Sequence, residues 1–258
     1  DASGNPVAVA TGSSGQVLTS AGAGAVPSFQ SAGSSAGTPA AGDLSTGTNN
    51  VALSATALDS IQAGAENNTG IGYNALTSVT TADKNVAVGT YAGKSLTTAG
   101  NNVAVGYEAL CSSTTGNGYN TAVGCSSLST LTTGSENVAI GWGTAQSITT
   151  GSYNSAIGQA ALSLTTTGEH NIGIGYDAGK KITTGSKNIA IGCGSHSVGV
   201  LTGTRNVTIG LNAGRTMTSG AENVSIGHTA GYDLTTGEKN IAIGFESQLY
   251  QTDGTNNV

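Results

Sequence analysis

Short runs in which apolar and small residues alternate recur along residues 50–258, and each run begins after an asparagine. One of them reads N-V-A-I-G from Asn137. The interval from one asparagine to the next takes only two values, the longer seen from Asn50 to Asn68 and the shorter from Asn68 to Asn85. A repeat this short is too small to fold as a domain, so each copy is expected to be one coil of a stacked array. The pattern therefore predicts a solenoid.

The alternation within a repeat predicts one short strand per coil. We number each repeat from its asparagine as position 0. Position +3 is Val, Ile or Leu in all twelve repeats, and position +1 is usually Val or Ile. Alternating β-branched residues indicate a strand, and we expect its aliphatic face to be buried. Position +2 is always small and points to the opposite face. We therefore expect the backbone of a neighbouring coil or chain to pack closely against that face.

The remaining positions predict how each coil closes. Position +4 is Gly in eleven of the twelve repeats, which suits a corner at the end of a strand. A small residue at +7 and an aliphatic residue at +11, such as Ala92 and Leu96, predict a second short strand or a bend. A T-T-G sequence then turns the chain toward the next asparagine.

The asparagines themselves are predicted to form a structural ladder. At a repeated corner, a side-chain amide bonds the same group one coil above and below, and it also satisfies backbone groups of the turn. The predicted ladder comprises Asn68, Asn85, Asn102, Asn120, Asn137, Asn154, Asn171, Asn188, Asn206, Asn223 and Asn240.

Composition divides the chain into two parts. Residues 1–42 are rich in Gly, Ser and Ala and predict an irregular connector. Residues 43–258 predict an all-β rod, a parallel β-solenoid of about twelve coils, which we expect to continue because Asn257 and Val258 begin a further repeat. A coil this short offers a thin core, so we expect several copies to pack around a common axis. Three is the number we favour, although periodicity alone does not set it.

Charge and hydropathy limit the expected partners. The net charge is −6 and the eight basic residues are spread thinly, so no nucleic-acid footprint is present. No apolar run reaches the length of a membrane span. The three cysteines are expected to be free. His170, His196 and His228 occupy different positions in their repeats, and the acidic residues before the asparagines are expected to be solvated. We therefore expect no catalytic residues, no metal site, no cofactor and no enzyme activity.

Aromatic residues recur at position +5 and form the one candidate binding column. They are Tyr73, Tyr107, Trp142, Tyr176 and Phe245. An aromatic column presents ring faces on which the apolar faces of sugars stack, so it is a candidate glycan contact. The alternative is that these rings pack between chains or cap the Gly corner.

The repeat resembles two known kinds of fibrous protein. The phrase N-V-A-I-G-x-x-A-G-x-x-L-T-T-G, best seen in Asn137–Gly151, Asn171–Gly185 and Asn223–Gly237, resembles the head repeats of trimeric autotransporter adhesins. It is also similar to repeats in bacteriophage tail-fibre proteins. The segment from Gly15 to Gln30 is similar to connectors in phage tail fibres. The resemblance implies a left-handed β-roll and an intertwined homotrimer.

These features favour the structural rod of an extracellular trimeric phage tail fibre, a virion component that displays a receptor-binding tip and supports host attachment. The expected partners are two further copies of the chain and other fibre or baseplate proteins, with a host surface glycan as a further candidate. The alternative is a bacterial trimeric surface adhesin whose repeats bind host or matrix directly. A third hypothesis is a monomeric ligand-binding solenoid.

Overall fold

The computed structural model describes residues 16–19, 28–31, 49–54, 56–116 and 118–257, in two units that comprise residues 1–40 and 41–258. In the first unit, β1 (Gln16–Thr19) pairs antiparallel with β2 (Ser28–Ser31). An irregular connector was predicted over residues 1–42, and this pair of strands lies within it. The other residues of that connector lie outside the described ranges.

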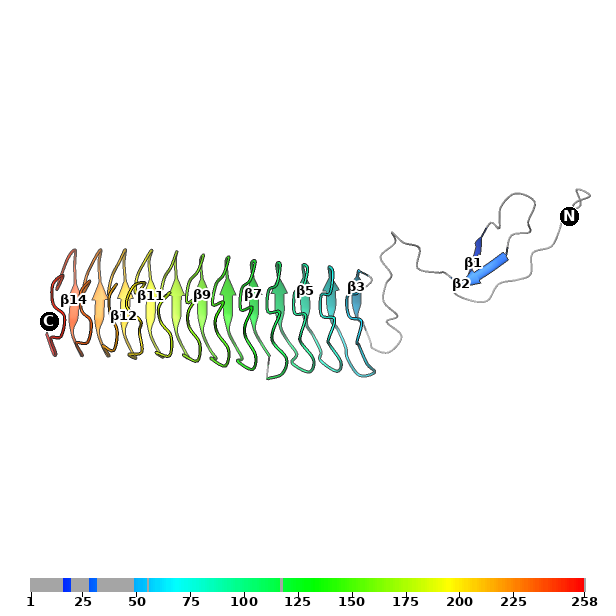
Figure 1. The fold of residues 1–258 in the computed structure, drawn as a ribbon, viewed down its shortest axis with the longest axis horizontal. Helices are drawn as coiled ribbons and strands as arrows, with labels where there is room; N and C mark the ends of the chain where they lie inside the picture. Colours follow the sequence, from blue (N-terminus) through cyan, green and yellow to red (C-terminus); the bar gives the residue numbers. More distant parts are fainter. Residues whose placement is uncertain (1–15, 20–27, 32–48, 55, 117, 258) are drawn as a thin grey trace, which may run out of the picture. The chain divides into compact units, whose positions relative to one another are not determined.

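The second unit is a parallel β-solenoid. Its twelve strands follow one another in sequence order, each hydrogen-bonded to its neighbours in the stack (Figure 1). The strands are β3 (Val51–Leu53), β4 (Thr69–Ile71), β5 (Val86–Val88), β6 (Val103–Val105), β7 (Thr121–Val123), β8 (Val138–Ile140), β9 (Ser155–Ile157), β10 (Ile172–Ile174), β11 (Ile189–Ile191), β12 (Val207–Ile209), β13 (Val224–Ile226) and β14 (Ile241–Ile243). The predicted all-β parallel solenoid is therefore confirmed. The described residues contain no helix that could cross a membrane.

Strand pairing keeps the same register along the whole stack. Each strand pairs its positions +1, +2 and +3 with the same positions of the next strand, as Ala139 does with Ala156. Equivalent residues of successive coils therefore lie in columns. A property that recurs at one position of the repeat becomes a continuous feature of the solenoid surface or of its core.

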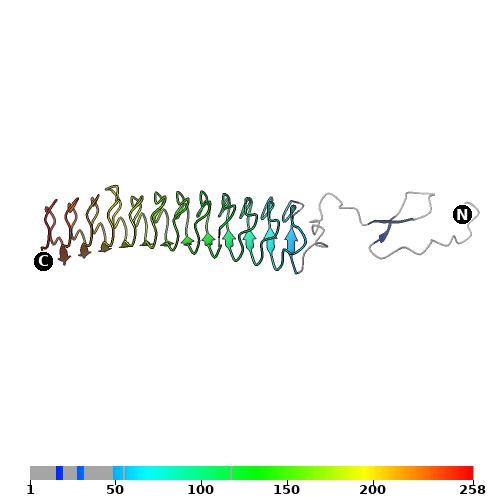
Figure 2. The same ribbon diagram turned by 90° about the horizontal axis from the view of Figure 1, so that it is seen from below.

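The return half of each coil is made of turns and bends. Of the two predicted alternatives for this segment, the structure has the bend. The strands lie along one side of the stack and the turns along the other (Figure 2). Backbone hydrogen bonds also join the turns of successive coils, as in the bond from the Leu162 N–H to the Ala178 carbonyl. A second column of main-chain bonds therefore supports the strand ladder.

The orientation of the strand faces corrects the sequence analysis. The small residue at +2 is buried in every strand, whereas the aliphatic residues at +1 and +3 are partly or largely exposed. Ala139, for example, is fully buried in the coil interior, and Ile140 beside it is exposed. The prediction that the aliphatic face is buried within the chain was wrong. The small residue does have a close neighbour, but that neighbour belongs to its own chain.

A narrow coil interior explains why position +2 must be small. A Cβ atom added at Gly173 would lie 2.8 Å from Leu162 Cγ and 2.9 Å from the Ala178 carbonyl oxygen. Strand and return segment therefore leave room for a methyl group or little more. The larger core side chains come instead from the return segment, where Leu162 and Ile182 are fully buried. Strand side chains larger than these small ones fit only on the outside.

The glycine at +4 closes the strand at a corner that other residues cannot easily occupy. Gly141 has a φ angle of +136°, and a Cβ atom there would lie 2.8 Å from the carbonyl carbon of Gly158 in the next coil. Both the backbone conformation and the close approach of the coils favour glycine. The predicted corner is therefore present. The close approach of the next coil is a second reason for glycine there, which the sequence did not reveal.

The asparagines at position 0 are linked from coil to coil, and those from Asn50 to Asn240 are buried. Asn154 donates from its backbone N and from Nδ2 to Asn137 Oδ1, at 3.0 and 3.1 Å. Its Nδ2 also donates to the Gly168 carbonyl oxygen at 2.9 Å. The bonds between amides run from Asn50 to Asn257. The amides thus form a continuous polar column inside the solenoid.

Candidate binding surface

The aromatic residues at +5 follow directly after the Gly corner that ends each strand. Their backbone is held in a recurrent way, because the N–H at +6 donates to the carbonyl at +5 of the preceding coil. Examples are the bonds from Ala160 to Trp142 and from Gly194 to Tyr176. The structure exposes Tyr73, Tyr107, Trp142, Tyr176 and Phe245 at this corner. Their contact with a glycan stays a prediction.

A further aromatic residue, which the sequence analysis did not single out, joins the first part of this column. The Tyr91 ring at position +6 lies edge-on to Tyr73, with 5.6 Å between ring centroids, and edge-on to Tyr107, at 6.2 Å. The three rings therefore form one cluster across three successive coils. Tyr91 stands one position after the column in the repeat, so the sequence pattern does not assign it to the column. Its contacts with the rings of the two neighbouring coils are seen only in the structure.

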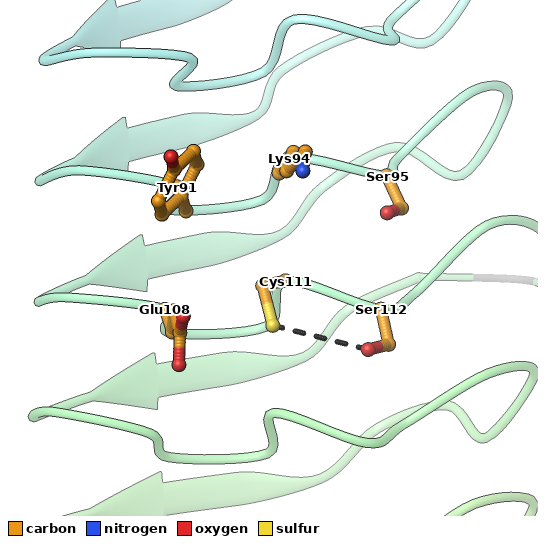
Figure 3. Close-up of a pocket in the computed structure, with 6 residues that line it drawn as sticks. All are labelled: Tyr91, Lys94, Ser95, Glu108, Cys111 and Ser112. Carbon is orange, nitrogen blue, oxygen red and sulfur yellow. Dashed lines mark hydrogen bonds between the residues drawn. The ribbon is translucent and has the colours of Figure 1, made fainter.

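A shallow hollow of about 380 Å³ opens beside this aromatic cluster (Figure 3). Tyr91, Lys94 and Ser95 line it from one coil, and Glu108, Cys111 and Ser112 line it from the next. Its polar groups therefore include one cation, one carboxylate and two hydroxyls. This composition suits hydrogen bonding to a polar ligand.

Electrostatic contacts order the side chains of the hollow. Lys94 Nζ lies 4.9 Å from the centroid of the Tyr91 ring, a cation–π contact. The Glu108 carboxylate raises the pKa of the adjacent Tyr107 phenol, first by hydrogen bonding and then by its charge. Cys111 donates from Sγ to the Ser129 carbonyl oxygen at 3.3 Å, and burial raises the pKa of its thiol. The thiol therefore stays protonated at neutral pH.

The aliphatic residues at +1 and +3 form a second extended surface. Because strands pair in register, these side chains form two columns along the outer face of the sheet. No charged residue occupies either position in any of the twelve strands, and only Thr69, Thr121 and Ser155 interrupt the apolar run. This surface, which we call the aliphatic face, has no covering layer within the described part of the chain.

Two of the histidines stack on aromatic rings and the third is buried. His170 stacks on Tyr153 at 4.7 Å and His228 stacks on Phe245 at 5.3 Å, whereas His196 is fully buried. Within the described ranges, no three His, Cys, Asp or Glu side chains gather in an arrangement that could hold a metal ion. The cysteines Cys111, Cys125 and Cys193 are free.

Comparison of the chain with protein-family models, with curated proteins and with solved structures found no match.

Proposed function

We propose that this chain forms the rod of a homotrimeric extracellular fibre, of the kind found in phage tails, which holds a receptor-binding tip away from its anchor. The proposal rests on one observation above all, the uncovered aliphatic face. Successive coils of one chain satisfy one another's backbone and asparagine amides, yet the strands carry their most hydrophobic residues on the outside. Such a surface is typical of a protein that associates along its length.

The aliphatic face is large enough for a stable interface. The exposed fraction of its more open side chains runs from 36% at Val86 to 65% at Ile243. Summed over twelve strands, this amounts to on the order of 1,000 Å² of apolar surface per chain, above the roughly 800 Å² per partner of a standard interface. The absence of charge on the face favours a dry contact, because no ion has to be desolvated.

A second copy of the same chain is the partner that matches this face best. Side chains recur on it at the rise of a parallel strand stack, about 4.7–4.8 Å. A partner that follows the face from end to end needs the same rise, and an identical solenoid has it. Charged residues such as Lys84, Lys187 and Glu136 lie on the corner before the strand, outside the face, where a rim remains in contact with solvent.

The number three and the left-handed coil follow from the resemblance to adhesin heads and phage fibres. Three faces that converge on one axis cover one another and leave the turn side of each solenoid outside. Hydrogen bonds join each coil to the next coil of the same chain, which supports side-by-side packing of complete solenoids in place of intertwined chains. The function is mechanical, because the stacked strands and the buried amides resist bending and protease attack, and no catalytic role is part of the proposal.

Light scattering on the full chain tests the assembly. One chain has a mass of 25.0 kDa, and the trimer predicts a particle of three times that mass. A particle of two chains would contradict the trimer but keep the aliphatic face as an interface. A monomer at micromolar concentration would refute the proposal and leave the aliphatic face without a role.

Charge substitutions then test which face makes the contact. Ile140→Asp combined with Ile157→Asp places two carboxylates on the aliphatic face, and we expect a folded monomer with an unchanged circular dichroism spectrum. The matched control is Gln146→Asp, because Gln146 is exposed on the return segment. This control should keep the mass of the wild-type assembly. Equal loss of assembly in both variants would show that the contact lies elsewhere.

A further inference from the structure

Large side chains recur in the aromatic column at every second coil. Position +5 carries a large apolar side chain on every second coil and a smaller or polar one on the coils between. The large residues are Tyr73, Tyr107, Trp142, Tyr176, Leu211 and Phe245. The intervening residues are Thr90, Cys125, Gln159, Cys193 and His228. The stacking of coils alone requires only a period of one, so the doubled period calls for a separate explanation.

The doubled period sets a regular spacing of exposed rings. All the strands pair in register, so residues two coils apart at +5 are separated by about 9.5 Å, twice the rise of a strand stack. The exposed fractions are 53% for Tyr73, 49% for Tyr107, 59% for Trp142 and 52% for Tyr176. These four residues therefore form a row of regularly spaced positions along the stack, and their side chains are comparably exposed.

Intervening coils with no ring at +5 or +6, as between Trp142 and Tyr176, keep the ring faces available. His228 and Phe245, which are rings at +5 of adjacent coils, stack face to face, with 5.3 Å between centroids and an interplanar angle of 7°. Such a stack covers the faces that a ligand would use. Within the described residues, Trp142 and Tyr176 have no other ring against them, and Tyr73 and Tyr107 both meet Tyr91 edge-on.

We propose that this row binds an extended β-1,4-linked polysaccharide that lies along the solenoid. Successive pyranose rings in such a chain are turned by half a revolution, so the same ring face recurs at every second sugar. The repeat of two sugars in an extended chain is close to the spacing of two coils. Each exposed ring therefore meets the apolar C–H face of every second sugar, a contact that aromatic rings favour.

The hollow beside Tyr107 supplies the hydrogen-bonding groups that a polysaccharide needs. Lys94 and Ser95 from one coil, and Glu108 and Ser112 from the next, line this hollow (Figure 3). Sugar hydroxyls both donate and accept, and this set offers an ammonium donor, a carboxylate acceptor and two hydroxyls. The hollow is lined by the coil that carries Tyr107 and by the coil before it, so one chain provides both kinds of contact.

This binding row does not depend on the proposed trimer, because every ring and every polar group belongs to one chain. The row follows the Gly corner, whereas the aliphatic face precedes it. A failure of glycan binding and a failure of assembly are therefore separate results. The glycan row also differs from a receptor-binding tip, because it extends along the rod.

Titration with defined hexasaccharides tests the proposal on the full chain. Trp142 is the single tryptophan, so its fluorescence reports directly on ligand at the row. We expect cellohexaose or chitohexaose to change this fluorescence, and maltohexaose, which is α-linked and curved, to leave it unchanged. Response to only one of the two β-1,4-linked probes would support the row and identify the substituent that the hollow accepts. No response to either, or an equal response to maltohexaose, would overturn the proposal.

Two substitutions that keep the reporter sharpen the test. Tyr107→Ala combined with Tyr176→Ala removes the rings on both sides of Trp142 and should weaken binding at least roughly tenfold. The matched control is Tyr119→Ala combined with Tyr153→Ala, because these rings are 59% and 48% exposed but lie at the corner before the strand. An equal loss in the control, or a changed solution mass in the first variant, would show that the row serves another purpose.

A third variant tests the doubled period itself. Gln159→Tyr adds a ring on the coil between Trp142 and Tyr176, where it should stack against its neighbours and cover their faces. We expect weaker binding although no ring has been removed. Stronger binding would show that the row binds sugars through its total aromatic surface, and it would refute the proposal that the two-coil spacing of the rings matches the sugar repeat.

Discussion

The buried asparagine column allows a sharp test of what stabilises the solenoid. Asn154 is almost fully buried in the middle of the ladder. Its Oδ1 accepts from the backbone N and from Nδ2 of Asn171, at 3.0 and 3.1 Å. Its Nδ2 donates to Asn137 Oδ1 and to the Gly168 carbonyl oxygen, at 3.1 and 2.9 Å. Asn154→Ala therefore removes one acceptor and one donor that serve both neighbouring coils.

The expected cost follows from the groups left without partners. The Asn171 backbone N–H and the Gly168 carbonyl lose these bonds when the amide is removed. Each unsatisfied buried group costs roughly 1–3 kcal/mol, so the loss of both should lower the free energy of unfolding by about 2–6 kcal/mol. Replacing a surface amide should cost less than about 0.5 kcal/mol. Gln159→Ala is that control, because Gln159 is an exposed amide in the same coil.

Urea denaturation and native-state hydrogen exchange, at a fixed protein concentration, measure the effect. Solenoids unfold coil by coil, so exchange should accelerate most in the coils on either side of residue 154. A loss below about 1 kcal/mol for Asn154→Ala, or a loss equal to that of the control, would refute the ladder as a source of stability. Fast exchange confined to the end coils would also contradict the reasoning.

Three further predictions concern the backbone and the core. His196 is buried without a partner for either ring nitrogen, and burial lowers its pKa to about 3. In the unfolded chain the His196 imidazole takes up a proton below pH 6.5, whereas the folded chain keeps it neutral down to about pH 3. The free energy of unfolding should therefore be unaffected by His196 above pH 6.5 and should fall as the pH is lowered toward 3. The loss should reach about 2–3 kcal/mol at pH 4.5, and His196→Leu should abolish it in acid melting curves. Gly141→Ala should lower the free energy of unfolding by about 2 kcal/mol or more in urea denaturation, because the φ angle of Gly141 is +136° and a Cβ atom there would meet the next coil. The control Gly143→Ala should cost only about 1 kcal/mol, because a Cβ atom there would make an ordinary contact. Glu136 is exposed with a φ angle of +59°, so Glu136→Gly should stabilise the chain by up to about 1 kcal/mol, and a lower urea midpoint would contradict this.

Much of the solenoid could be predicted because its information is periodic. The asparagine interval, the β-branched alternation and the glycine at +4 predicted one strand and one corner per coil, and the structure has both. The sequence was less informative at positions whose backbone conformation depends on contacts with the next coil. The residue before the asparagine, such as Glu136 or Lys187, has a left-handed φ angle although it is not glycine. Stacked coils enforce that conformation, so no local sequence signal marks it.

The candidate site was predictable in its residues but not in its arrangement. The sequence identified the ring at +5 in each of several repeats, but Tyr91 at +6 was not singled out. Whether Tyr91 joins those rings depends on contacts between coils. The hollow beside it also needs two coils, because Lys94 and Glu108 come from different repeats. Such features depend on lateral packing, which the repeat unit does not encode.

The sequence by itself determined the architecture, because a short and nearly constant interval with one strand in each repeat allows only a stack of coils. It did not determine which side of the strand faces inward. Hydrophobicity alone favoured Ile140 as a core residue and Ala139 as a contact with a neighbouring coil or chain. The tertiary structure reverses them, because the return segment passes so close to the strand that only a small side chain fits between the two. Steric space inside a narrow coil thus outweighs the hydrophobic preference and places the aliphatic residues on the outer face.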